Sequence, residues 1–217
     1  KIYSKNRLLT TIAYRINGKT TYAMEGSIFI AGAGVQWLRD RMKFFKKAPE
    51  TEKIIKKLKD NNGIYLVPAF TGLGAPHWNA NSRGVLSGIT RDTSPEEIIR
   101  ATIEAVAYQT YDLFEAMKHD GLRPKIVKVD GGMVMNNWFS QFLSDIINVK
   151  VLRPEVQETT AAGAAFMAGL KIGVYKSLKD ISKNWNLNRK FSPKMSNVNR
   201  SKLIKGWSKA IDRTLIN

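Results

Sequence analysis

The stretch from Lys125 to Ile147 constrains the fold more than any other part of this 217-residue chain. An apolar segment, Lys125 to Asp130, leads into the pair Gly131-Gly132, and apolar residues at helical spacing follow Asn136. Glycines allow positive φ and a close approach of a ligand to the main chain, and the amino end of a helix favours anions. The pattern predicts a strand, a glycine turn and a helix that bind a nucleotide, although an ordinary tight turn would show the same two glycines.

The composition is that of a globular protein. Apolar residues make up 43% of the chain, no apolar run has the length of a membrane span, and no charged-then-apolar leader opens the sequence. The absence of cysteine excludes disulfides and thiolate metal sites, and His77 and His119 lie far apart in the sequence without partners at ligand spacing. We therefore expect a soluble protein without a structural metal, in keeping with a reducing cytoplasm.

The charge is strongly basic. Thirty-five Lys and Arg against eighteen Asp and Glu give a net charge of +17, so attraction to nucleic acid, anionic membranes or phosphorylated ligands has to be considered. The lysines recur on the polar faces of periodic segments such as Glu52 to Lys59, whose apolar positions are expected to face inward. This distribution favours solvated helix faces over a dedicated nucleic-acid-binding arm.

The remaining pattern predicts antiparallel strands first and then helices that alternate with strands. Asn17-Gly18 separates two runs rich in Thr, Ile and Tyr, which is typical of a hairpin. Ser27 is expected to cap a helix that begins at Ile28, and Ser94-Pro95-Glu96-Glu97 forms a capping box for a long helix. Further expected elements are a polar helix at Thr51 to Lys59, strands at Ile64 to Phe70, Val85 to Thr90 and Val149 to Leu152, a small-residue helix at Thr159 to Lys171, and amphipathic segments at Leu178 to Trp185 and Arg200 to Ile216.

This order predicts an α/β fold with a mixed sheet covered by helices on both faces. No internal repeat, low-complexity tract or long linker divides the sequence, so residues 1–217 are expected to form a single domain. Because the chain begins within strand-like sequence, we expect it to be a piece of a longer protein.

The loop from Thr71 to Gly84 carries an aromatic residue and an arginine as well as turn residues. Two interpretations are open: a structural loop that packs Trp78 under a helix, or a wall of a cleft. The structural interpretation is favoured because the loop holds no evident proton acceptor. His77 has no partner in the sequence pattern, so we do not expect it to act as a catalytic base.

Several stretches of the sequence match the motifs of one known family. They are Tyr22–Phe29, Ala31–Asp40, Val67–Trp78, Gly84–Ile89, Glu97–Glu104 and Val129–Asn137. On these motifs the chain resembles the C-terminal domain of the FGGY carbohydrate kinases, and within that family the glycerol kinases. The resemblance spans nearly the whole sequence.

The resemblance implies an actin/hexokinase-like (ribonuclease H-like) domain, one of two that hold ATP between them while glycerol becomes sn-glycerol 3-phosphate. It implies nucleotide contacts from Gly32, Gln36, Gly132 and Asn136, with Gly131 included because the two glycines form one turn. Gly32 and Gln36 are one helical turn apart and so share a face. ATP and Mg²⁺ are the implied cofactors, and the full-length enzyme is expected to be a homo-oligomer.

The resemblance places no catalytic residue in this chain. Kinases of the family use an aspartate as general base and a glycine-threonine phosphate turn, and both precede the segment with which this sequence begins, as do the glycerol contacts of the N-terminal domain. Asp130 is expected to orient the glycine turn rather than to act as a base. We expect the isolated chain to be inactive and its strand Leu8 to Ile16 to present an unpaired edge.

Two alternatives are open for the function. Within the family, the acceptor could be another polyol or a sugar, because the implied specificity residues lie outside this sequence. From a different class, the charge of +17 is compatible with a basic, nonenzymatic nucleic-acid-binding domain.

Overall fold

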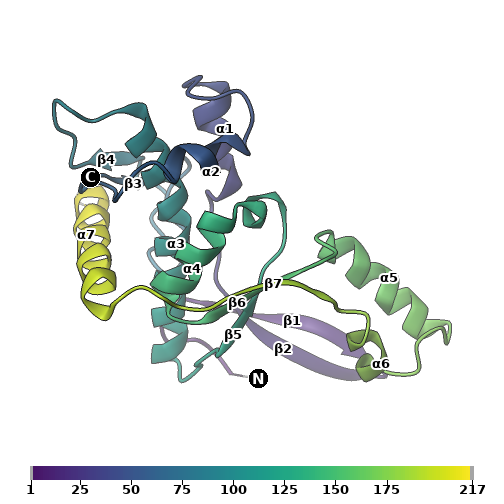
Figure 1. Ribbon diagram of the computed structural model, residues 1–217. Coiled ribbons are helices and arrows are strands. Elements are labelled where there is room, and N and C mark those ends of the chain that lie inside the picture. The colour runs from purple at the N-terminus through teal and green to yellow at the C-terminus, as the bar shows by residue number, and fades with distance from the viewer. Residues whose placement is uncertain (1, 216–217) are drawn as a thin grey trace.

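The computed structural model describes residues 2–215. In chain order its elements are β1 (Leu9–Ile16), β2 (Lys19–Glu25), α1 (Gly32–Asp40), α2 (Glu50–Ile55), β3 (Tyr65–Val67), β4 (Val85–Ser87), α3 (Pro95–His119), β5 (Ile126–Lys128), the 3₁₀ helix η1 (Gly132–Met135), α4 (Asn137–Ile147), β6 (Lys150–Pro154), α5 (Thr159–Lys171), α6 (Leu178–Ser182), β7 (Leu187–Phe191) and α7 (Asn197–Leu215). Figure 1 shows α3 at the centre of the molecule, with α4 and α7 nearby.

Helix α3 is the element on which the others pack. It begins at the predicted capping box, where the Ser94 N–H donates to Glu97 Oε2 at 2.6 Å. Helices α1, α2 and α4 and strand β3 all contact it. Tyr108, near its middle, stacks on Trp207 of α7 with ring centroids 5.3 Å apart, and both residues are buried. The core therefore lies between α3 and its neighbouring helices.

The strands of the described chain form three separate sheets. β1 and β2 form the predicted hairpin, and its turn residues Asn17 and Gly18 both have positive φ, as this tight turn requires. β3 pairs with β4. In the third sheet β5 is parallel to β6, and β7 is antiparallel to β6. The predicted α/β class and the mixed sheet are confirmed, but that sheet has three strands only.

Helix α4 packs on one face of the β5–β6–β7 sheet, where Val151 and Phe191 are buried. Side chains alternate along a strand, so Ile126 and Lys190 face the other way, and Ile126 is 53% exposed. Strand β7 was not predicted at all, because most of its side chains are polar and exposed.

Two predicted helix boundaries are wrong. Ser27 does not cap a helix, because α1 begins at Gly32; the Ser27 carbonyl instead accepts a hydrogen bond from the Ala75 N–H at 3.0 Å. That bond ties the segment before α1 to the loop at residues 71–84. Helix α2 ends at Ile55, four residues before the predicted Lys59. The small-residue helix α5, in contrast, has the predicted bounds.

The loop at residues 71–84 is a structural element. Trp78 packs against a buried cluster that includes Leu113 and Ala116 of α3, and its Nε1 donates to the Arg7 carbonyl at 2.6 Å. The neighbouring His77 Nε2 lies 3.2 Å from Asp112 Oδ2, which also accepts a hydrogen bond from Trp207 Nε1 at 2.8 Å. The expectation that His77 has no partner is therefore wrong, because folding brings α3 against this loop. His77 and His119 also line one shallow hollow.

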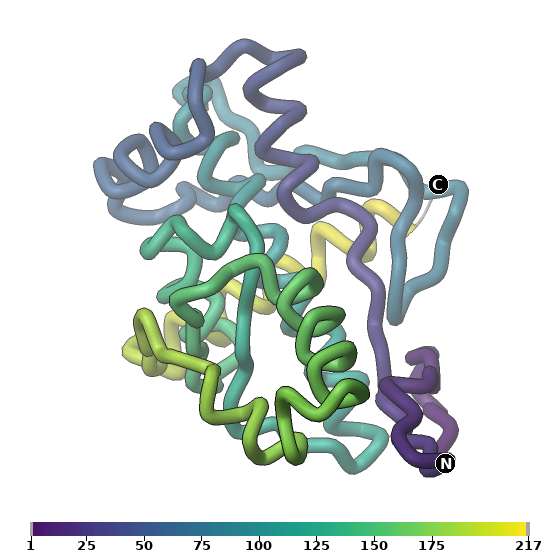
Figure 2. The backbone as a smooth tube through the Cα atoms, turned by 90° about the vertical axis from the view of Figure 1, so that its right-hand side faces the viewer, coloured from purple at the N-terminus to yellow at the C-terminus, as the bar shows by residue number. Residues whose placement is uncertain are grey.

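The β1–β2 hairpin and the helices α1 and α2 form opposite ends of the molecule (Figure 1 and Figure 2). In both views the hairpin β1–β2 lies far from α1 and α2, which sit at the opposite end (Figure 1 and Figure 2). None of the helices between residues 2 and 215 combines the length and the apolar character that crossing a membrane requires.

Candidate functional site

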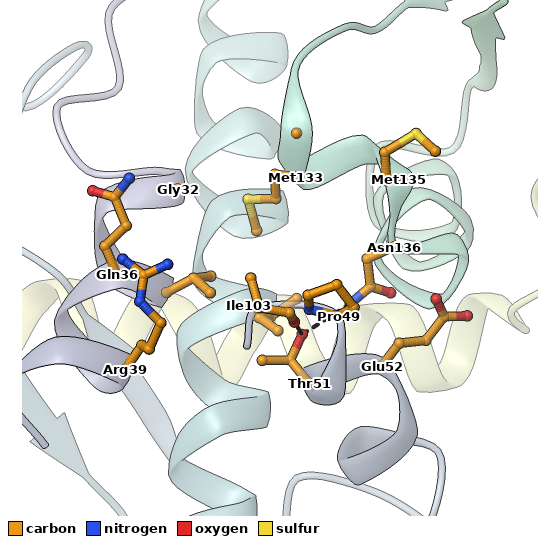
Figure 3. A pocket seen from close by; sticks show the side chains of 13 residues that line it. Gly32, Gln36, Arg39, Pro49, Thr51, Glu52, Ile103, Met133, Met135 and Asn136 are labelled. Atoms are coloured by element: carbon orange, nitrogen blue, oxygen red, sulfur yellow. Dashed lines mark hydrogen bonds between the residues drawn. The ribbon is translucent and has the colours of Figure 1, made fainter. Parts of the chain in front are cut away.

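A pocket of about 380 Å³ lies where α1, the segment leading into α2, the middle of α3 and η1 meet. We call it the α1–η1 pocket. Its lining residues are Gly32, Val35, Gln36, Arg39, Ala48, Pro49, Thr51, Glu52, Ile103, Gly132, Met133, Met135 and Asn136. Figure 3 shows Gln36 and Arg39 on one side, Met135 and Asn136 on the other, and the α2 segment below them.

Four of the five residues predicted to contact a nucleotide line this pocket: Gly32, Gln36, Gly132 and Asn136. They come from two segments far apart in the sequence, and the fold brings them to one cavity. The fifth, Gly131, is not part of the lining. Its φ of 83° lies in the left-handed region, so it shapes the turn through its backbone. The assignment of these residues to a nucleotide stays a prediction.

The two lining glycines leave the pocket wall open. A Cβ atom added to Gly32 or to Gly132 would meet nothing within 4 Å, so neither glycine is required by contact with the rest of the protein. A side chain at either position would project into free space next to the pocket. The bare main chain therefore remains accessible to a ligand.

The glycine pair lies in the connection between β5 and α4, as predicted. The 3₁₀ turn Gly132–Met135 comes first, and α4 begins at Asn137. Asn136 is the cap of α4, and its Oδ1 accepts from the Phe139 N–H at 3.0 Å. The side-chain oxygen of Asn136 therefore caps α4, while its Nδ2 points towards Thr51 Oγ1, 3.5 Å away.

Sequence reasoning missed the contribution of α2. Glu52 was interpreted as part of a solvated face, but its side chain is only 19% exposed and lines the pocket. Its Oε2 accepts from the Asn137 N–H at 3.3 Å, and its Oε1 lies 2.6 Å from Lys56 Nζ. Thr51 Oγ1 donates to the Ala48 carbonyl at 2.7 Å. No local motif marks these residues, because their role depends on α2 packing against the start of α4.

The electrostatics of the pocket suit binding rather than proton transfer. Burial opposes the charge of Glu52, but the Lys56 ammonium and the Asn137 N–H together outweigh it and hold the pKa of this carboxyl below its ordinary value. Arg39 is engaged by Asp40, with Nε 2.6 Å from Oδ1. Glu52 is the only carboxylate of the described lining. It is ionised and already bound by Lys56 and the Asn137 N–H, which makes it a poor general base.

The lining combines apolar and hydrogen-bonding groups. Val35, Ile103 and Met133 supply apolar walls, and the amides of Gln36 and Asn136 supply hydrogen-bonding groups at the edges. A nucleobase with its ribose combines these properties. Among residues 2–215 no group of three His, Asp or Glu side chains is placed to hold a metal ion.

The fold is that of an actin-like α/β domain. Comparisons with known proteins agree with this fold. Residues 4–172 match the C-terminal domain of the FGGY family of carbohydrate kinases, and the chain belongs to this family. The family prediction made from the sequence motifs is therefore confirmed.

Two curated relatives and one solved structure that resemble the chain are glycerol kinases. Glycerol kinase 1 of Pseudomonas aeruginosa is 55% identical over 98% of this chain and 43% of its own length. The glycerol kinase of Gluconobacter oxydans is 53% identical over 99% of this chain and 42% of its own length. The crystal structure of Plasmodium falciparum glycerol kinase with ADP matches with a TM-score of 0.90 and 38% identity, over 100% of this chain and 44% of that one. The chain thus spans less than half the length of each relative.

Proposed function

We propose that this chain is the ATP-binding domain of a glycerol kinase and that the α1–η1 pocket receives the adenosine part of ATP. The observation that carries the proposal is that Gly32, Gln36, Gly132 and Asn136 line one cavity. Two further observations support it. The cavity has apolar walls with amides at its edges, and the Plasmodium relative of the same fold was crystallised with ADP.

The chemical step requires groups that this pocket does not supply. Transfer of a γ-phosphate depends on placing the acceptor hydroxyl in line and on neutralising the phosphate charge, for which Mg²⁺ is the ordinary ion. Within the described chain the pocket offers Glu52 and Thr51 as its acid and hydroxyl, and both are engaged by neighbouring groups. We therefore place the general base and the glycerol contacts in a part of the protein outside these 217 residues, and expect no turnover by the chain alone.

Three finer points belong to the same proposal: transfer to glycerol rather than to another polyol or sugar, a homo-oligomeric enzyme, and a cytoplasmic location. The first is supported by the identity of the relatives, which are named glycerol kinases. The other two rest on the likeness to the family.

Calorimetric titration of the chain tests the binding role. We expect ATP to bind and ADP to compete with it, and duplex DNA to bind negligibly near physiological salt. A chain that ignores ATP but binds DNA with a steep loss of affinity as salt rises would overturn the proposal in favour of a nucleic-acid-binding domain.

A second experiment tests the acceptor. ATP hydrolysis is measured in the full-length protein that contains this chain, with glycerol as the acceptor or with xylulose as the matched control. Stimulation by xylulose alone would replace glycerol kinase by another activity of the same family.

A further inference from the structure

A buried arginine side chain, that of Arg153, contacts η1, the turn that lines the α1–η1 pocket. Arg153 on β6 is 6% exposed, yet none of the ion pairs formed among residues 2–215 includes it. Placing a charged side chain inside a protein is unfavourable unless hydrogen bonds replace its hydration. Desolvation lowers the pKa of Arg153 from its ordinary value, and the nearby Arg189 adds to this effect. An apolar residue of similar size would avoid the penalty, so the hydrogen bonds of this guanidinium need an explanation.

Those hydrogen bonds converge on the turn that lines the pocket. Arg153 Nη1 donates to the Val134 carbonyl at 2.7 Å and to the Met135 carbonyl at 3.3 Å. Both carbonyls belong to η1, which is too short to pair its own last groups. Arg153 Nη2 donates to Asn137 Oδ1 at 3.1 Å, at the first residue of α4. The planar fork of the guanidinium therefore joins the end of η1 to the start of α4.

The remaining nitrogen anchors the fork to the sheet. Arg153 Nε donates to Asn188 Oδ1 of β7 at 2.9 Å, so the side chain is held on the strand side as well. On the pocket side, Glu52 Oε2 accepts a hydrogen bond from the Asn137 N–H at 3.3 Å. Asn137 is thus held between a buried cation and an ionised carboxylate, and the residue before it is the pocket-lining Asn136.

We propose that Arg153 is a positioning residue of the nucleotide pocket: its guanidinium holds η1 and the start of α4 in the arrangement that presents Gly132 and Asn136 to the ligand. Arg153 does not line the pocket itself, so it acts through the main chain of residues 134–137. This inference rests on the proposed function in that it names the ligand as ATP. The ordering of the turn does not depend on the ligand.

The test compares Arg153→Met with Arg189→Met. The two guanidinium groups lie over the same Phe191 ring, 5.6 Å and 5.3 Å from its centroid, but Arg189 is exposed on β7. The dissociation constant for ATP is measured by calorimetry at a temperature at which circular dichroism shows both variants folded. We expect Arg153→Met to weaken binding about tenfold or more, and Arg189→Met to leave it within about twofold. A merely structural role would lower the melting temperature and leave the affinity of the folded protein unchanged.

Hydrogen exchange at the amides of residues 133–137, measured without nucleotide, gives a second readout. Exchange there should be faster in Arg153→Met and unchanged in Arg189→Met. If the wild-type chain does not bind ATP, the proposed function fails, and the exchange data alone decide whether Arg153 orders the turn. Wild-type exchange in Arg153→Met would overturn the inference, as would wild-type ATP affinity.

Arg153→Lys covers the case in which the methionine variant does not fold. Lysine keeps the charge but lacks the planar fork, so it cannot reproduce the simultaneous bonds to η1 and to Asn137. We expect it to fold and to bind ATP more weakly than the wild type. Affinity and exchange both equal to the wild type would show that the fork is not needed and would overturn the inference.

Discussion

Arg100 and Glu104 form an ion pair inside the protein, with Arg100 Nε 2.7 Å from Glu104 Oε1 and the glutamate side chain fully buried. They are one turn apart on α3. Glu104 Oε2 also accepts hydrogen bonds from the Tyr108 hydroxyl and from Asn61 Nδ2, each at 3.1 Å. Arg100 Nη1 donates to the Leu58 carbonyl at 2.9 Å. The pair therefore connects the start of α3 to the segment between α2 and β3.

Removing the charge of Glu104 should destabilise the protein strongly. In Glu104→Gln the Arg100 guanidinium stays buried without an ionised partner, so we expect a loss of about 3–5 kcal/mol in the free energy of unfolding. Urea denaturation measures it. Glu115→Gln is the matched control, because Glu115 pairs with Lys118 at the surface at 3.3 Å and should lose about 0–1 kcal/mol. Equal losses of unfolding free energy in the two variants would show that the buried pair stabilises the protein no more than the surface pair does.

Glu52 should contribute a pH-dependent part of the stability. Its pKa is lowered in the folded protein, because Lys56 and the Asn137 N–H outweigh the effect of burial. A carboxyl with a lowered folded pKa stabilises the folded state above its unfolded pKa, and the contribution disappears as the pH falls through the folded pKa.

The variant Glu52→Gln isolates that contribution. Relative to the wild type it should be less stable near about pH 7, and the difference should shrink as the pH falls below about 4. Urea titrations at a series of pH values measure the difference. A deficit of the same size at both ends of the series would mean that shape rather than charge is responsible.

The two glycines of the turn should respond differently to a side chain. Gly132→Val places its branch in open space at the pocket, so ATP affinity should fall about tenfold or more while the melting temperature changes little. Gly131→Val should instead cost about 1–3 kcal/mol of stability, because φ there is 83°. Calorimetry with ATP and thermal unfolding separate the two effects. Gly163→Ala on α5, also in open space but away from the pocket, is the control. Unchanged ATP affinity in Gly132→Val would contradict the proposed site.

The hairpin should cause self-association. Within residues 2–215 strand β1 pairs only with β2, and its Ile12 is 62% exposed. An open strand edge with exposed apolar residues is a common route to pairing between chains. We expect sedimentation velocity to show larger species as the concentration rises and Ile12→Lys to reduce them. Ile89→Lys, at a site 59% exposed and outside the hairpin, should not. A monomer at every concentration would remove this prediction.

Local structure could be predicted where a few neighbouring residues carry the information. The capping box Ser94 to Glu97 marks the start of α3, and Asn17-Gly18 marks the turn of the hairpin, because both signals depend on residues at most three positions apart. Strand β7 could not be predicted. It is held by main-chain hydrogen bonds to β6 and buries little but Phe191, so it lacks the alternation of apolar residues that marks a half-buried strand.

The sequence by itself determined the α/β class and the family, because both depend on local pattern or on motifs of adjacent residues, and the resemblance implied nucleotide contacts from Gly32, Gln36, Gly132 and Asn136. Only the tertiary structure brought Glu52 and Arg153 to the start of α4, where both form hydrogen bonds with Asn137. Their partners are distant in the sequence and come into reach only when α2 and β6 pack around η1. Contacts of that kind are set by the packing of whole elements, and no short stretch of residues encodes them.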